Sequence, residues 1–139
     1  MKWYFASRLY HKPKIVDITN FLTQKREVVL SDWIYEDSLA PYSKNISKVK
    51  SLTKRVVKSL LKTDIFVLIS DSAGTDMFVE LGVCLTKNDS VKKVKIYIVG
   101  EHGKRSLMQL HPSIIHAKNL REVFKKEKID CKNFKVPEF

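Results

Sequence analysis

The chain has 139 residues, 44% of them hydrophobic, and a formal net charge of +11. This length predicts one domain over residues 1–139, and the hydrophobic content is enough for a packed core, which argues against wholesale disorder. No apolar run approaches the roughly 18 residues of a membrane span, and the first residues lack the apolar core of a signal peptide. We therefore expect a cytoplasmic protein that does not cross a membrane.

The basic charge favours anionic partners such as nucleic acid or nucleotide phosphate, although a lysine-rich solvated surface accounts for it equally well. The basic residues are spread along the chain and no stripe interleaves them with aromatics, so specific nucleic-acid binding is not expected. Cys84 and Cys131 form no CxxC pair. We expect two reduced thiols, with a lone disulfide as the alternative.

The first half of the chain alternates between strand and helix patterns. A short apolar run at residues 2–7 predicts a strand, residues 27–33 begin as a short second strand, and residues 14–25 have apolar positions at helical spacing. Residues 31–45 are then the loop that leaves the second strand. Residues 34–45 are polar and aromatic and predict a long loop. Residues 46–62 place their apolar side chains on one face and most of six basic residues elsewhere, which predicts an amphipathic helix.

The same alternation continues in the second half. "DIFVLIS" (64–70) is apolar throughout, as expected of a strand that is covered on both faces. Residues 75–87 and 119–128 predict helices, residues 91–100 predict a strand, and residues 111–117 predict a short fifth strand. The alternation predicts an α/β fold: a doubly wound, mostly parallel five-stranded sheet, flavodoxin-like or Rossmann-like, with helices on both faces.

Ligands of such sheets bind outside the carboxyl ends of the strands, so the loops that leave those ends are candidate sites. These loops carry side chains that suit a sugar, a base and a phosphate, namely Ser7, Arg8, Asp32, Trp33, Asp71, Ser72 and Gly74. Gly74 lets the backbone approach a ligand, and the helix after it offers free N–H groups to an anion. In that helix Asp76 suits the helix dipole, whereas Glu80, between Val79 and Leu81, lacks an obviously solvated setting.

Four segments in order, "YFAS", "SDW", "TDIFVLISDSAGTDMFVELG" and "KIYIVG", resemble the nucleoside 2-deoxyribosyltransferase family. That family includes deoxynucleoside 5′-monophosphate N-glycosidases. The resemblance implies that Glu80 is a nucleophile that attacks the anomeric carbon, and that another base or water resolves the glycosyl ester. It further implies that Tyr4 orients this glutamate, that Ser7 and Arg8 meet the sugar or its 5′-phosphate, and that the protein is a homo-oligomer.

The chain departs from the family pattern at one acid. The aspartate that relatives carry eight residues before the third strand corresponds to Val56, beside Lys54 and Arg55. A proton donor to the departing base would then come from Asp71, Asp76 or Asp32. Arg8 could pair with a phosphate in bidentate fashion, and Trp33 could stack on a base.

Other motifs are absent from the sequence. There is no Walker A loop, no GxGxxG turn and no HExxH pattern, so we expect neither a cofactor nor a metal. The leading hypothesis is an N-glycosyl transferase or hydrolase that acts on a nucleoside or its 5′-monophosphate. The alternatives are a non-catalytic nucleotide-binding or sensing domain on the same fold, and a nucleic-acid-binding protein that uses the basic helix 46–62.

Overall fold

The structure is a computed structural model that describes residues 1–90 and 93–139. Its strands are β1 (Lys2–Ala6), β2 (Val28–Val29), β3 (Ile65–Ile69), β4 (Lys95–Val99) and β5 (Ile114–Ala117). Its α-helices are α1 (Lys12–Gln24), α2 (Ile46–Lys62), α3 (Asp76–Ser90) and α4 (Leu120–Lys126). Short 3₁₀ turns are η1 (Leu9–His11), η2 (Asp32–Tyr35), η3 (Tyr42–Lys44) and η4 (Leu107–Leu110).

The strands form one parallel sheet in the order β2-β1-β3-β4-β5, which confirms the predicted fold class. The chain runs from β1 outward to β2, and then returns to the other side of β1 to form β3. The strand order therefore reverses between β1 and β3, the position where ligands bind in doubly wound sheets.

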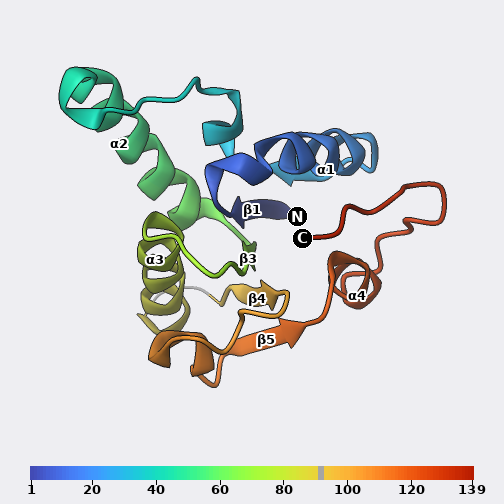
Figure 1. Ribbon diagram of the computed structural model, residues 1–139. Coiled ribbons are helices and arrows are strands. Elements are labelled where there is room, and N and C mark those ends of the chain that lie inside the picture. Colours follow the sequence, from blue (N-terminus) through green and yellow to red (C-terminus); the bar gives the residue numbers. More distant parts are fainter. Residues whose placement is uncertain (91–92) are drawn as a thin grey trace.

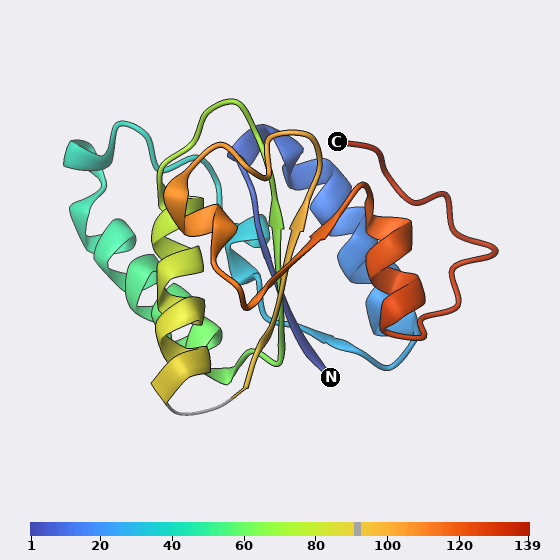
Figure 2. The ribbon, with the colours of Figure 1, turned by 90° about the horizontal axis from the view of Figure 1, so that it is seen from below.

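Helices cover both faces of the sheet: α1 and α4 lie on one side, and α2 and α3 on the other (Figures 1 and 2). Alternation along the strands explains which side chain faces which layer. Trp3 and Phe5 belong to the cluster with α1 and α4, whereas Tyr4 and Ala6 belong to the cluster with α2 and α3. All five residues of β3 are fully buried, as its unbroken apolar run predicts.

The second strand is short, as expected for the start of the segment 27–33, and is observed as Val28–Val29. The Leu30 amide still donates to the Trp3 carbonyl at 2.8 Å, but the ladder ends there, because the next bond between the strands is made by the Ser31 side chain. The Ser31 hydroxyl accepts from the Phe5 amide at 2.6 Å. After this side-chain hydrogen bond the backbone enters η2. The predicted loop 34–45 contains the end of η2 and all of η3.

Two other boundaries differ from the sequence prediction. The strand expected at 91–100 is observed as Lys95–Val99, and residues 91–92 lie outside the described residues. The last helix ends at Lys126 rather than 128, where Lys128 takes a left-handed φ of 59°. Its start is fixed by the Asn119 side chain, which accepts from the Glu122 amide at 3.2 Å.

Helix α2 has the predicted bounds, but most of its apolar face does not pack in the core. Its N-terminal half projects beyond the edge of the sheet (Figure 1). Leu60 alone among its residues is fully buried. The apolar side chains nearer the N-terminus, Val49, Leu52 and Val56, instead line a cavity.

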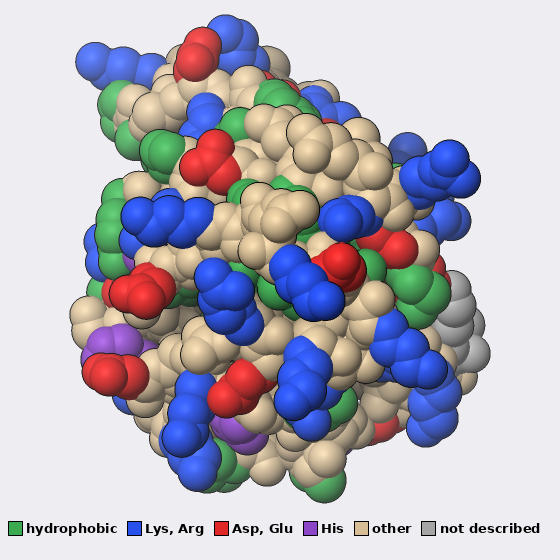
Figure 3. All heavy atoms as spheres, turned by 90° about the vertical axis from the view of Figure 1, so that its right-hand side faces the viewer, with side chains coloured by type: hydrophobic (Ala, Val, Ile, Leu, Met, Phe, Trp, Pro, Cys, Tyr) green, Lys and Arg blue, Asp and Glu red, His purple; other side chains and the backbone are tan. Residues whose placement is uncertain are grey.

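Lysine and arginine side chains are scattered over the face that carries α4 and the C-terminal segment, with acidic side chains between them (Figure 3). This distribution agrees with a solvated basic surface rather than with a continuous basic stripe. In the part of the chain that the structure describes, no helix is both long and apolar enough to cross a membrane.

Candidate active site

A cavity of about 900 Å³ opens at the carboxyl edge of the sheet beside the point where the strand order reverses. Four parts of the chain line it: the loop after β1, the segment from η2 to η3, the inner face of α2 and the first turns of α3. Of the predicted site residues, those that line it are Ser7, Arg8, Trp33, Gly74, Asp76 and Glu80. The α2 side of the cavity is apolar, and the α3 side carries the acids.

Glu80 and Tyr4 form a hydrogen-bonded pair at this cavity. Tyr4 points from β1 toward α3, and its hydroxyl donates to Glu80 Oε1 at 2.6 Å. Glu80 is half-buried because its neighbours on α3, Met77 and Leu81, pack in the core on either side of it. The resemblance placed these two residues together, and the structure brings them into contact.

The surroundings of Tyr4 and Glu80 determine the pKa of each side chain. Burial raises the pKa of Glu80 to about 7, an effect that the Tyr4 hydrogen bond opposes and the nearby Asp76 reinforces. Burial and the neighbouring Glu80 raise the pKa of Tyr4 well above its ordinary value, so its hydroxyl keeps the proton that it donates. A carboxylate that titrates near neutrality beside a permanent donor is typical of a reactive acid.

The turn before α3 needs glycine. Gly74 has a φ of +109°, and a Cβ there would lie 2.8 Å from Met77 Cε and 3.4 Å from Arg8 Cγ. The turn therefore lets the chain pass closely between the loop after β1 and the start of α3. Asp76, the first residue of α3, is exposed and lines the cavity on this side.

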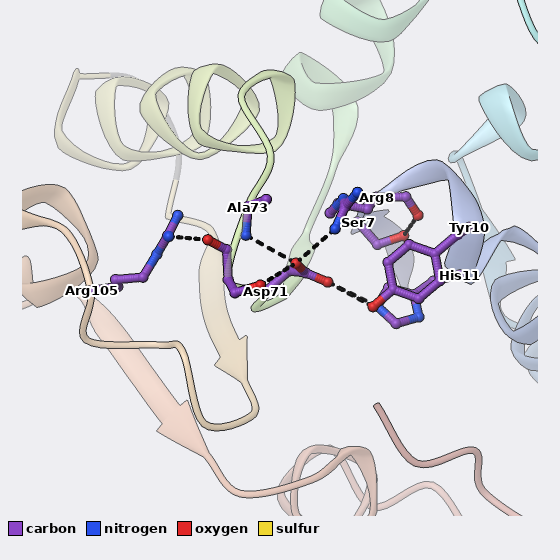
Figure 4. A network of polar contacts seen from close by, with 8 residues as sticks. Ser7, Arg8, Tyr10, His11, Asp71, Ala73 and Arg105 are labelled. Atoms are coloured by element: carbon purple, nitrogen blue, oxygen red, sulfur yellow. Dashed lines mark hydrogen bonds and ion pairs between the residues drawn. The ribbon is translucent and has the colours of Figure 1, made fainter.

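Asp71 lies behind the cavity wall rather than in it. It is 5% exposed, and its carboxylate joins two loops (Figure 4). Oδ1 accepts from Arg8 Nη1 at 3.2 Å and from the Ala73 amide at 3.0 Å, while Oδ2 accepts from the Tyr10 hydroxyl at 2.8 Å. His11 Nε2 lies 3.4 Å from Oδ2. The Ser72 hydroxyl donates to Oδ1 at 3.4 Å. We call Asp71 with these five partners the Asp71 cluster.

This cluster keeps Asp71 ionised. Burial acts to raise the pKa of Asp71, but the Ala73 amide, the Tyr10 hydroxyl and Arg8 together hold it well below its usual range. A carboxylate in that state is a poor proton donor. The structure thus gives Asp71 the surroundings of a residue that positions Arg8 and Tyr10, both of which line the cavity.

The remaining predicted residues divide between the cavity and its supports. Trp33 is half-buried, lines the cavity, and donates from Nε1 to the Phe5 carbonyl at 3.1 Å. Ser7 lines the cavity, with its hydroxyl 3.1 Å from the Arg8 carbonyl. Ser72 is exposed and outside the cavity; its carbonyl accepts from Arg105 (Figure 4).

Asp32 also lies outside the cavity lining and is held from α2. Its Oδ2 accepts from Arg55 Nε at 2.8 Å, and the same guanidinium pairs with Glu36. Lys12 Nζ donates to the Glu36 carbonyl at 2.6 Å, so the η2 segment is tied to α1 as well. Val56, the position where the resemblance leads us to expect an acid, contributes an apolar surface to the cavity.

Sequence reasoning missed several residues of this site. Glu36, Asp37 and Tyr10 line the cavity, and Arg55 supports it. Tyr10 lies in a loop predicted to be functional, but Arg55 looked like one more basic residue of an amphipathic helix, and its partners lie 19 and 23 positions away. Among the described residues, no group of three or more His, Cys, Asp or Glu side chains could hold a metal ion.

No protein-family model and no curated protein matches this chain. Among solved structures, the chain is similar to that of the CMP N-glycosidase BcmB from Clostridium botulinum. The two share 15% sequence identity with a TM-score of 0.57, and the alignment covers 94% of this chain and 100% of BcmB. At this level of identity the likeness concerns the fold, and it agrees with the doubly wound parallel sheet described above.

Proposed function

We propose that this protein cleaves the N-glycosidic bond of a nucleoside or a nucleoside 5′-monophosphate, with Glu80 as the nucleophile. The observation that carries the proposal is the 2.6 Å hydrogen bond from Tyr4 to Glu80 at the wall of the cavity. It places an ionisable carboxylate, already oriented, where ligands bind in this fold. The fold likeness to a CMP N-glycosidase supports the same class of substrate.

The reaction follows from the geometry of this pair. Oε1 of Glu80 is engaged by Tyr4, so Oε2 attacks C1′ of the sugar, and a C1′–O bond forms as the C1′–N bond breaks. The electron pair of the broken bond goes to the base, which takes up a proton and leaves. Water or a second base then attacks C1′, the ester bond breaks, and the Glu80 carboxylate is restored. The attacking group gives its proton to the residue that had protonated the first base, which returns that residue to its starting state.

Asp76 is the proton donor that the cavity best supports. It lines the cavity, four residues before Glu80 on the same helix, whereas Asp32 and Asp71 lie outside the lining. Asp32 also pairs with Arg55, and Asp71 is held ionised by its cluster. The role of Asp76 rests on this placement.

Arg8 and Trp33 are proposed to contact the ends of the substrate. Arg8 uses Nη1 to contact Asp71, and its side chain is 43% exposed, which leaves the rest of the guanidinium for a 5′-phosphate. The free N–H groups at the start of α3 favour the same anion. Trp33, held by its bond to Phe5, offers a ring surface to the base.

A homo-oligomer is proposed from exposed apolar side chains of α2 and α3, two of which, Val57 and Val79, also line the cavity. Val57 is 45%, Leu61 55% and Val79 69% exposed, and these side chains lie on the two helices that line the cavity. Large apolar side chains exposed together on one side of a protein are common at subunit interfaces.

The experiment that tests the function is incubation with a panel of nucleosides and 5′-monophosphates, followed by chromatography for the free base. Wild type should release base from at least one member, and Glu80→Gln should lose several powers of ten in rate, because the covalent path is removed. Asp89→Asn, an equally conservative change on the exposed far part of α3, is the control and should retain activity. Turnover by Glu80→Gln at the wild-type rate would reject the proposal.

The second candidate is a nucleotide-binding domain without catalysis. The observation in its favour is Val56, an apolar side chain in the cavity where relatives carry an acid. In that case calorimetry would detect binding of a monophosphate from the panel, and no free base would appear on prolonged incubation.

A further inference from the structure

The C-terminal segment, defined here as residues 131–139, returns to the carboxyl edge of the sheet, where the C label lies in Figure 2. Phe134 stacks on Phe21 of α1 with ring centroids 4.1 Å apart, and Val136 is buried in the core. The segment ends against the first turn of α1, where Lys14 Nζ donates to the Glu138 carbonyl at 2.5 Å. Phe139 there meets the edge of His11, with centroids 5.1 Å apart and planes at 77°.

His11 is enclosed between this segment and the Asp71 cluster. The residue is 4% exposed, and its Nε2 lies 3.4 Å from Asp71 Oδ2. Its Nδ1 is buried and has no hydrogen-bond partner among the described residues. Burial lowers the pKa of His11, so the ring is neutral, and its one N–H is best placed on Nε2, toward the carboxylate.

Asp71 connects His11 to side chains that line the cavity. The carboxylate that faces His11 also accepts from Arg8 and from Tyr10, and both of these side chains line the cavity (Figure 4). Arg8 and Tyr10 are exposed, and besides Asp71 their side chains contact each other and, for Tyr10, the His11 ring, with centroids 3.8 Å apart. A shift of the Asp71 carboxylate would therefore move both groups.

We propose that His11 is a positioning residue of the candidate active site, and that Phe139 of the C-terminal segment holds it in place. The C-terminal segment thus sets the orientation of Asp71 and, through it, of Arg8 and Tyr10. As a consequence that rests on the proposed function, the segment controls how tightly the site holds the phosphate end of a 5′-monophosphate while leaving the Glu80 chemistry unchanged.

The positioning is tested first without any substrate. The Ala73 amide donates to Asp71 Oδ1 at 3.0 Å, so its hydrogen exchange, measured by NMR, reports directly on the carboxylate. His11→Leu and Phe139→Ala should each speed this exchange at least about fivefold, and His11→Gln, which keeps an N–H donor near Asp71, should restore slow exchange. Phe134→Ala is the matched control: the same residue type in the same segment, also half-buried, but stacked on Phe21.

Unchanged exchange at Ala73 in both His11→Leu and Phe139→Ala would overturn the proposal, as would equal acceleration in Phe134→Ala. If His11→Leu fails to fold, the exchange rate in Phe139→Ala alone tests the proposal, because that variant keeps the buried His11 ring. The second measurement uses a monophosphate that wild type cleaves. Phe139→Ala should raise KM about tenfold and leave kcat unchanged. A residue with a merely structural role would not change KM alone. A wild type that cleaves nothing refutes the proposed function and leaves the exchange result to decide the positioning.

Discussion

At the scale of single residues, the account depends on the pair of Tyr4 and Glu80. The pKa of Glu80 is raised to about 7 chiefly by burial, and the hydroxyl of Tyr4 opposes that rise. The nucleophile must be ionised, so the ionisation of Glu80 should appear in the pH profile of kcat/KM for a nucleoside as a rising limb near 7. A nucleoside is the right substrate for this measurement because it carries no titrating phosphate.

The Tyr4→Phe variant tests whether the Tyr4 hydroxyl lowers the pKa of Glu80. Removing the hydroxyl removes the interaction that lowers the pKa of Glu80, so the rising limb should move to higher pH. Activity should then be lost most at neutral pH and largely recovered in alkaline buffer. A limb that moves to lower pH, or a loss that is the same at every pH, would contradict the assigned role of Tyr4.

The residue scale is also where prediction from sequence ends. The Tyr4–Glu80 pair was expected only because the segments that contain these residues resemble the nucleoside 2-deoxyribosyltransferase family, and the two side chains are in contact. Asp71 was predicted as a candidate acid, whereas the structure surrounds it with five polar partners from two loops. Those loops meet only in three dimensions, so no spacing in the sequence carries that information.

At the scale of elements, the turn into α3 allows a prediction about stability, for which a second glycine in α3 is the control. Gly74 has a positive φ and no room for a Cβ, so Gly74→Ala should lower the free energy of unfolding by about 1–3 kcal/mol. Gly82, inside the same helix, has nothing within 4 Å of the position of a Cβ. Gly82→Ala should stabilise the protein by up to about 1 kcal/mol, because alanine is the better helix former.

Urea unfolding of the two variants measures both effects. Equal stabilities for Gly74→Ala and Gly82→Ala would mean that the turn tolerates a side chain and that its close approach to Arg8 is not required. Because Gly74 lines the cavity, the first variant should also weaken binding of substrate, while the second should not.

The elements themselves were largely predictable, with informative exceptions. The five strands and four α-helices follow from apolar runs and helical spacing, and α2 has the predicted bounds. The second strand is short as expected, and the Ser31 side chain, which accepts from the Phe5 amide, replaces the next ladder bond. The sequence predicted that α2 is amphipathic, but hydrophobic periodicity cannot distinguish a face that packs in the core from one that lines a cavity.

At the scale of the whole molecule, the net charge of +11 predicts weak, non-specific attraction to nucleic acid. The basic side chains on the face seen in Figure 3 are scattered among acids, so no surface there is built for a duplex. Binding to an oligonucleotide, followed by fluorescence anisotropy, should fall by at least about tenfold between low and physiological salt. Tight binding that persists at physiological salt would favour a nucleic-acid-binding function over the proposed one.

The most direct test of the central claim is intact-mass spectrometry of the protein after incubation with a 2-fluoro-substituted analogue of a cleaved nucleoside. The fluorine slows release of the sugar, so a covalent glycosyl ester should accumulate. The account predicts a mass increase of one sugar on wild type, located by peptide mapping to Glu80, and none on Glu80→Gln. Base release by wild type without any adduct, or an adduct on the Gln variant, would contradict a covalent mechanism at Glu80.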